Sequence, residues 1–133
     1  MPNTATPISS TWLAKLKSFF GKPFWADPRT LLGLWSLLAI LAGLTKMTPA
    51  RHNNFLIFRG VFDHLIQHLS LYAEYPAEYF DHNHYGPVFA LVIAPFALVP
   101  ESVGLVLWLL ALSLGMYYAV RKLPLEQGKQ IFL

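Results

Sequence analysis

The chain has 133 residues, with ten Lys or Arg, seven Asp or Glu, a formal charge of +3 and no cysteine. Hydrophobic residues make up 55% of it, charged residues 13%, and the mean hydropathy is +0.44. A soluble domain of this size could not bury so much apolar side chain. The lack of cysteine excludes a disulfide framework and a thiolate metal site, and the small charge without a Lys/Arg stripe argues against nucleic-acid binding. We therefore expect an all-α integral membrane protein.

Residues 1–28 form the first segment of the predicted organisation. Residues 1–10 are rich in Pro, Thr and Ser, which predicts a disordered start. From Thr11 to Phe24, large apolar residues recur at helical spacing among three lysines. This pattern is typical of a short helix that lies on the membrane with its lysines among the lipid headgroups. A docking helix for a partner protein is the alternative interpretation.

Residues 29–46 predict a first transmembrane helix. Asp27 is a suitable N-cap, Pro28 is a suitable first helical residue, and the run from Leu31 to Leu44 carries no charge. With its flanks this run approaches the roughly 20 residues that a span needs. Because four Lys or Arg precede the run, the positive-inside rule places the N-terminus in the cytoplasm.

Residues 47–86 form a polar loop that holds most of the chain's Asn, Asp, Glu, His and Tyr. Between Asn54 and Leu69 the apolar residues have helical spacing, which predicts an amphipathic helix parallel to the membrane. Its predicted polar side consists of Asp63, His64, Gln67 and His68. Residues 71–85 have no sustained period and contain Pro76, so we expect an irregular, ordered loop at the interface, where Tyr is favoured.

Residues 87–122 predict a transmembrane helical hairpin. Pro87 can begin a helix that Pro95 bends, and a tight turn at Pro100 leads into an uncharged helix from Ser102 to Val120. This gives about three spans in total. The two cations after the last span then lie outside, so the positive-inside rule supports the first span and opposes the third. We interpret residues 123–133 as a tail or as the beginning of a further span.

Several short motifs follow one another between Leu31 and Leu123. They are N-N-F-x-I-F-R at residues 53–59, L-Y, Y-P, H-Y-G-P-x-F-A at 84–90, A-P-F-A-L-x-P at 94–100, and then a Trp-containing apolar helix. In this order they resemble glycosyltransferase family 87, a family of polyprenyl-phosphate-sugar-dependent enzymes that includes bacterial α-mannosyltransferases. The resemblance implies the N-terminal part of a GT-C type membrane fold, with a large extracytoplasmic loop and many further spans.

The resemblance also implies a reaction. A hexosyl group, mannosyl-like, passes from a polyprenyl-phosphate donor to an acceptor hydroxyl at the outer face of the bacterial inner (plasma) membrane, without a cofactor. The implied partners are the donor, membrane lipid and the remaining transmembrane helices of the same or a partner chain. Because family members have many more helices, we expect a fragment that is inactive alone. The alternative is a complete three-span scaffold or regulatory subunit, whereas a transporter fragment is disfavoured because no charged residue lies inside a span.

Such a transfer needs a base for the acceptor hydroxyl and a cation or donor for the phosphate. The family commonly has an Asp, thought to be the base, at the position matched by Asn54, and an amide cannot take the proton. We therefore expect another carboxylate of the loop to be the base. Asp81 and Glu78 are favoured because they lie on the irregular loop with two histidines, and Asp63 is the next choice.

Five residues are candidates for substrate binding: Asn53, Asn54, Arg59, His84 and Tyr85. Arg59 matches a position where the family has Arg or Lys, and it either holds a phosphate or contacts lipid headgroups. Tyr85 begins a Tyr-Gly-Pro sequence that corresponds to the family's Tyr-Pro-Pro signature, although the proline could simply start a helix. Two histidines four residues apart suit a metal site in principle, but no HExxH pattern is present, and we predict no metal.

Overall fold

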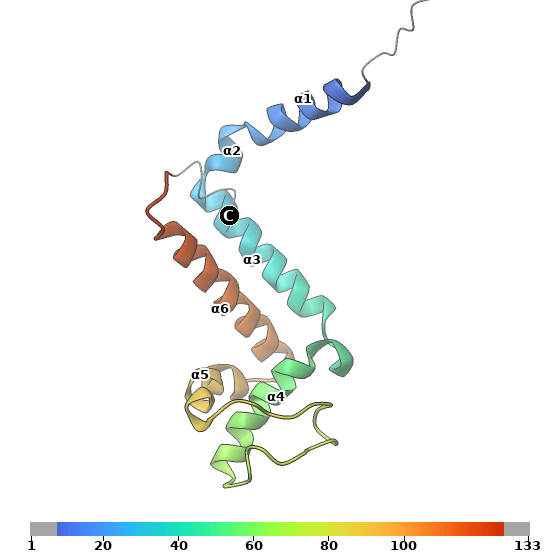
Figure 1. Ribbon diagram of the computed structural model, residues 1–133, viewed down its shortest axis with the longest axis vertical. Helices are drawn as coiled ribbons and strands as arrows, with labels where there is room; N and C mark the ends of the chain where they lie inside the picture. The colour runs from blue at the N-terminus through green and yellow to red at the C-terminus, as the bar shows by residue number, and fades with distance from the viewer. Residues whose placement is uncertain (1–7, 127–133) are drawn as a thin grey trace, which may run out of the picture.

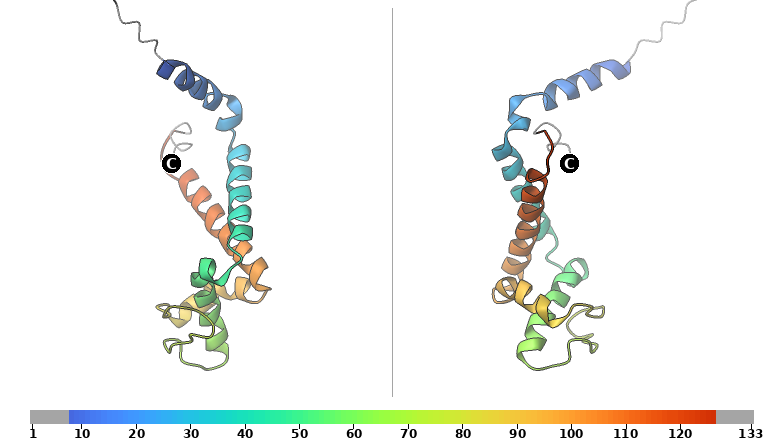
Figure 2. Two further views of the ribbon diagram at one scale, coloured as in Figure 1. Left: turned by 90° about the vertical axis from the view of Figure 1, so that its right-hand side faces the viewer. Right: turned by 60° about the vertical axis from the view of Figure 1, so that its left-hand side comes forward.

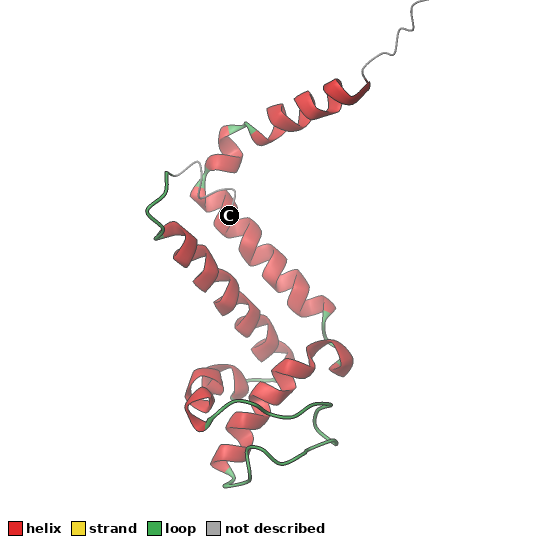
Figure 3. Cartoon of the chain, in the orientation of Figure 1, coloured by secondary structure: helices red, strands yellow, loops and turns green. Residues whose placement is uncertain are grey.

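The computed structural model describes residues 8–126, which form helices and loops without any strand. In chain order the helices are α1 Ile8–Phe20, α2 Pro23–Ala26, α3 Pro28–Thr45, α4 Pro49–Ile66, α5 Pro87–Ala97 and α6 Glu101–Arg121. Helices α3 and α6 run side by side, and α1 turns away at one end of this pair (Figure 1). At the other end, α4, α5 and the loop between them form what we call the lobe; this loop is the longest non-helical stretch in Figure 3. The all-α prediction is confirmed.

The N-terminal segment is helical from Ile8, earlier than the predicted start at Thr11, while residues 1–7 of the predicted disordered start lie outside the described residues. Every side chain from Thr11 to Phe20 is exposed. Aromatic rings hold the elbow between α1 and α2, because the ring centroids of Phe19 and Phe20 lie 5.1 and 5.5 Å from that of Trp25. Placement of α1 on a membrane or on a partner protein stays a prediction.

Helix α3 begins where the sequence predicts. Oδ1 of Asp27 accepts the backbone N–H of Arg29 at 2.8 Å, and Pro28 is the first helical residue. A carboxylate at this position satisfies a free N–H of the first turn and interacts favourably with the positive end of the helix dipole. Helix α3 has 18 residues with a mean hydropathy of 1.4, so it is long and apolar enough to cross a membrane.

Helix α6 lies antiparallel to α3 and contacts it along its length. At one end Gly43 packs on Val106, in the middle Ser113 Oγ donates to the Trp35 carbonyl at 3.3 Å, and at the other end the Tyr117 hydroxyl donates to the Pro28 carbonyl at 3.0 Å. Small residues at such a contact allow two helix backbones to approach closely. With 21 residues and a hydropathy of 2.0, α6 is the second helix in the described part of the chain that could cross a membrane.

Helix α5 does not provide the third predicted span. It has 11 residues, and at 1.5 Å per residue it reaches about 16 Å, roughly half the thickness of a bilayer's hydrocarbon core. It lies across the end of α6 (Figure 2) and packs mainly on α4, and the structure does not confirm the predicted third span. The helix is short because it begins at Pro87 and Pro100 disfavours helical backbone at Val99, which leaves few residues for it between the two prolines.

Helix α4 departs from the predicted amphipathic pattern because two of its sides are covered by protein. Phe55, Phe58 and Phe62 pack in the core with residues of α5 and α6, as the predicted apolar stripe requires. On another side Ile57, Val61 and His64 are also buried, and Ile66 and Leu69 at the end of the predicted stripe are exposed. The predicted polar side fails at His64, since the loop folds back over it.

Candidate functional site

A cavity of about 380 Å³ lies where the lobe meets the two long helices. Its polar lining comes from the end of α3 and the start of α4: Lys46, Arg51, His52, Asn53 and Asn54. Its apolar lining comes from α4 and α6: Phe55, Phe58, Leu105, Trp108, Leu109 and Leu112. A cavity that combines an apolar wall with a few polar groups suits a ligand with one charged end and one apolar end.

His52 connects the elements around the cavity. Its side chain is buried, with Nδ1 at 2.8 Å from the carbonyl oxygen of Lys46 and Nε2 at 2.7 Å from Oε1 of Glu101, at the start of α6. A carbonyl oxygen only accepts, so Nδ1 donates to Lys46, and Nε2 lies within hydrogen-bond distance of the Glu101 carboxylate. The backbone of His52 is non-helical, with φ −125° and ψ 24°, so α4 is kinked beside the cavity.

His52 is not among the site residues that the sequence predicts. The signal that could have found it is a titratable side chain in the short polar connection between two apolar helices, immediately before the N-N-F-x-I-F-R motif. Its partner Glu101 lies 49 positions further along the chain. No local pattern could have predicted that contact, because it exists only once α6 is placed beside α4.

Asn53 and Asn54 both line the cavity but differ in their surroundings. Oδ1 of Asn53 accepts the backbone N–H of Phe80 at 2.8 Å, and this bond fixes the loop onto α4. Asn54 is exposed. The bond to Phe80 brings the next residue of the loop, Asp81, to the cavity end of α4. Asp81 is exposed there, and its Oδ1 accepts the backbone N–H of His82 at 2.8 Å.

Replacing Asn53 by Ala is expected to loosen the loop without unfolding the lobe. The Phe80 N–H loses its acceptor, and a hydrogen bond contributes about 0.5–1.5 kcal/mol, so exchange of this amide should accelerate by up to about tenfold. Hydrogen–deuterium exchange of the peptides around residue 80 measures the effect. Asn54→Ala is the matched control and should leave the rate unchanged; equal rates in the two variants would show that Asn53 does not anchor the loop.

A second polar group lies further along α4. His64 is 2% exposed, its Nε2 donates to Oε2 of Glu78 at 3.0 Å, and its ring lies on that of Tyr75 with centroids 3.7 Å apart. Within residues 8–126, the buried atoms Nδ1 of His64 and Oη of Tyr79 have no hydrogen-bond partner. Gly60 allows this packing, since a Cβ there would lie 2.8 Å from Cε1 of Tyr79. A buried donor thus holds the Glu78 carboxylate at the surface of the lobe.

Charges in this second group affect one another. Burial raises the pKa of Asp63 above its usual value and Glu78 raises it further, whereas Arg59 and His64 oppose the shift. Burial also raises the pKa of Tyr79, and Glu78 adds to that effect.

The three predicted bases lie near two different ends of α4. Asp81 follows the residue that Asn53 binds, whereas Asp63 and Glu78 belong to the His64 group. Asn53 and His64 are eleven positions apart, which corresponds to about 16 Å along a helix at 1.5 Å per residue. A base must lie within hydrogen-bond reach of the hydroxyl that it deprotonates. Of the three, Asp81 is the one placed toward the cavity end.

The remaining predicted binding residues lie at the edge of the lobe, and their contacts are with the protein itself. Nη1 of Arg59 donates to the Val99 carbonyl at 2.9 Å, just after α5 ends. A cation at the C-terminal end of a helix interacts favourably with its dipole.

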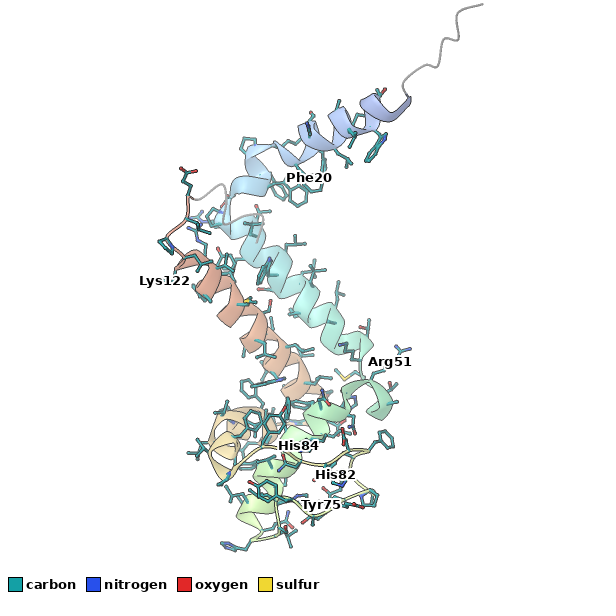
Figure 4. All side chains as sticks on the ribbon, in the orientation of Figure 1. Phe20, Arg51, Tyr75, His82, His84 and Lys122 are labelled. Carbon is teal, nitrogen blue, oxygen red and sulfur yellow. The ribbon has the colours of Figure 1, made fainter. Side chains whose placement is uncertain are left out.

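The Tyr85 ring is stacked on that of Phe89, with centroids 4.6 Å apart. His84 is exposed in the loop; Figure 4 labels it together with Tyr75 and His82 of the same loop. Substrate contact by these residues stays a prediction.

Among residues 8–126 the structure has no group of three or more His, Asp or Glu side chains that could hold a metal ion. The two histidines considered for a metal differ in their surroundings, because His64 is buried in α4 whereas His68, just after the helix ends, is exposed with a positive φ of 58°. The Leu69 N–H bonds to the His64 carbonyl at 2.9 Å, which closes a turn that ends the helix. His82 pairs instead with Glu74 at 3.0 Å.

The fold and the cavity define a helical protein with two helices of membrane-spanning length and a polar lobe at one end of them. Residues 83–129 match the model of Glycosyltransferase family 87. This match covers about a third of the chain, from the end of the loop through α5 and α6, and it supports the resemblance to that family carried by the motifs at residues 84–90 and 94–100. No curated protein and no solved structure matches the chain.

Proposed function

We propose that the chain provides the donor-binding part of a membrane glycosyltransferase that transfers a mannosyl-like hexosyl group from a polyprenyl phosphate to an acceptor hydroxyl. The observation that carries the proposal is the cavity, whose lining joins the cations Lys46 and Arg51 to the apolar residues around Trp108. A polyprenyl-phosphate sugar has the same division into a charged head and an apolar tail. The match to Glycosyltransferase family 87 supports the class of reaction.

The proposed setting is a bacterial plasma membrane that α3 and α6 both cross. Because these helices are antiparallel, the four cations before α3's apolar run and the two at the end of α6 lie at the same end of the pair, opposite the lobe. The positive-inside rule then places that end in the cytoplasm and the lobe outside. With two spans instead of three, the cations at the end of α6 lie on the cytoplasmic side, so the topology no longer conflicts with the positive-inside rule.

In the proposed reaction, the acceptor oxygen forms a bond to the anomeric carbon while the bond from that carbon to the phosphate oxygen breaks. The hydroxyl proton passes to a carboxylate, for which Asp81 is our choice, and the electron pair leaves with the polyprenyl phosphate. Lys46 and Arg51 stabilise the charge that grows on the departing phosphate. Asn54, exposed at the cavity lining, is available to bind a sugar hydroxyl.

Binding of a polyprenyl phosphate to the full chain in nanodiscs tests the proposal. We expect a saturable change of tryptophan fluorescence that is lost in Trp108→Phe. Removing both cations with Lys46→Gln and Arg51→Gln should weaken binding at least about tenfold, because hydrogen bonds to charged groups contribute about 1.5–3 kcal/mol each.

Two controls make this test specific for the cavity. The double variant Lys22→Gln with Lys122→Gln removes the same charge at the far end of the spans and should bind like the parent chain. A polyprenol without phosphate should bind much more weakly than the phosphate. Equal affinity for both lipids, or unchanged binding after loss of Lys46 and Arg51, would contradict the proposal.

A further inference from the structure

His52 is a buried titratable residue beside the cavity that the proposed reaction does not use. Its side chain is 2% exposed, and its two ring nitrogens face two acceptors, the Lys46 carbonyl oxygen at 2.8 Å and Oε1 of Glu101 at 2.7 Å. Lys46 is the C-cap of α3, and Glu101 is the first residue of α6. A single ring in α4 therefore joins the ends of α3 and α6.

The sequence neighbours of His52 carry part of the polar lining of the cavity. Arg51 and Asn53 both line it, and the backbone of α4 is kinked between them, at His52. Arg51 lies at the start of α4 beside the end of α3 (Figure 4), and its Nη1 donates to the Thr45 carbonyl at 3.4 Å. The bond from His52 to the Lys46 carbonyl thus holds the kinked turn against the end of α3.

Glu101 brings a negative charge to this end of the cavity. Its side chain is 50% exposed, and one of its oxygens lies 2.7 Å from a residue of the cavity lining. Charges in physiological salt act on one another over roughly 8–10 Å, so an unpaired carboxylate here would oppose a phosphate held by Lys46 and Arg51. The imidazolium is the form of the His52 ring that donates from both nitrogens. In that form the ring also cancels the charge of Glu101.

We propose that His52 is a positioning residue for the donor phosphate, as an imidazolium that pairs with Glu101 and holds the kinked start of α4. This role rests on the proposed function, in which a polyprenyl phosphate binds in the cavity. His52 acts through its neighbours and without touching the phosphate. Because the pair of His52 and Glu101 is neutral as a unit, Lys46 and Arg51 supply the net charge of the cavity lining.

His52→Asn separates the charge pair from the bond to Lys46. The shorter amide takes the position of Nδ1 and can still donate to the Lys46 carbonyl, but it does not reach Glu101 and carries no charge. Tryptophan fluorescence of the full chain in nanodiscs measures the affinity for a polyprenyl phosphate, and circular dichroism measures helix content. His52→Gln, whose longer amide reaches Glu101 without a charge, repeats the test if His52→Asn loses helix content.

We expect His52→Asn to bind the polyprenyl phosphate about five- to tenfold more weakly than the parent chain, because an uncompensated carboxylate then repels it. Weak binding of a polyprenol without phosphate should not change. Adding Glu101→Gln should restore the affinity to within about twofold of the parent. Adding Glu126→Gln instead, which removes the same charge past the far end of α6, should not restore it.

The rescue distinguishes a charge pair from a merely structural contact, since lost packing would not depend on the charge of Glu101. Unchanged binding in His52→Asn overturns the inference, and so does an equal loss for the polyprenol or a failure of Glu101→Gln to restore binding. In each of these cases the parent chain still binds the polyprenyl phosphate, so the proposed function stands. A parent chain that does not bind it would contradict both.

Discussion

Asp81→Asn is expected to lower the rate of sugar transfer by a factor of about 10² to 10⁴, the range typical for loss of a positioned general base. The amide keeps the size of the side chain, and its oxygen can still accept the His82 N–H that Asp81 binds at 2.8 Å. The change therefore removes the proton acceptor and leaves the loop in place. Transfer from a labelled polyprenyl-phosphate sugar, in membranes that contain the chain together with the remaining transmembrane helices of the enzyme, measures the loss.

Glu78→Gln is the matched control for this experiment. Its amide oxygen can still accept the hydrogen bond from Nε2 of His64, so we expect the variant to keep most of the transfer activity. Asp63→Asn should behave in the same way, because Asp63 belongs to the same group, far from the cavity end of α4. Retained transfer in Asp81→Asn, with loss in either of the other two, would move the base to the His64 group.

Short sequence motifs predicted the helices whose ends depend on interactions within a single turn. Asp27 and Pro28 mark the start of α3 because a capping carboxylate and a preset φ act within one turn. The uncharged run before Arg121 likewise predicts α6. The length of α5 was also readable in principle, since Pro100 limits the helix that precedes it. The prediction of a third span gave more weight to the apolar composition of α5 than to this stop.

Contacts between distant segments were not predictable from periodicity. The buried side of α4 around His64 is covered by Tyr75 and Tyr79, which come from the loop that follows the helix. The apolar stripe in the sequence describes only one face of α4, so the sequence predicts a polar surface on the other face. The same limit applied to the cavity, since the bond from Asn53 to Phe80 joins residues 27 positions apart. The residue types of the site were visible in the sequence, but their division between two ends of α4 was not.

Gly104→Ala is expected to be among the most destabilising single changes in the chain, with a cost of about 1–3 kcal/mol or more. Gly104 is buried in the first turn of α6, and a Cβ there would collide with the carbonyl oxygen of Phe96 and lie 3.0 Å from Cζ of Phe55. A backbone carbonyl cannot rotate aside as a long side chain can, so the turn between α5 and α6 must open. Thermal unfolding of the full chain in detergent micelles, followed by circular dichroism, should show a midpoint lower by about 5 °C or more.

Gly115→Ala is the matched control, since Gly115 lies on the same helix with no atom within 4 Å of an added Cβ. Alanine favours helix over glycine by up to about 1 kcal/mol, so this midpoint should stay the same or rise. Equal midpoints in the two variants would mean that the turn at Gly104 tolerates a side chain.

The change at Gly104 should also affect ligand binding, because Phe55, which contacts this turn, lines the cavity. Opening the turn at Gly104 should therefore weaken binding of the polyprenyl phosphate, and Gly115→Ala should leave that binding unchanged.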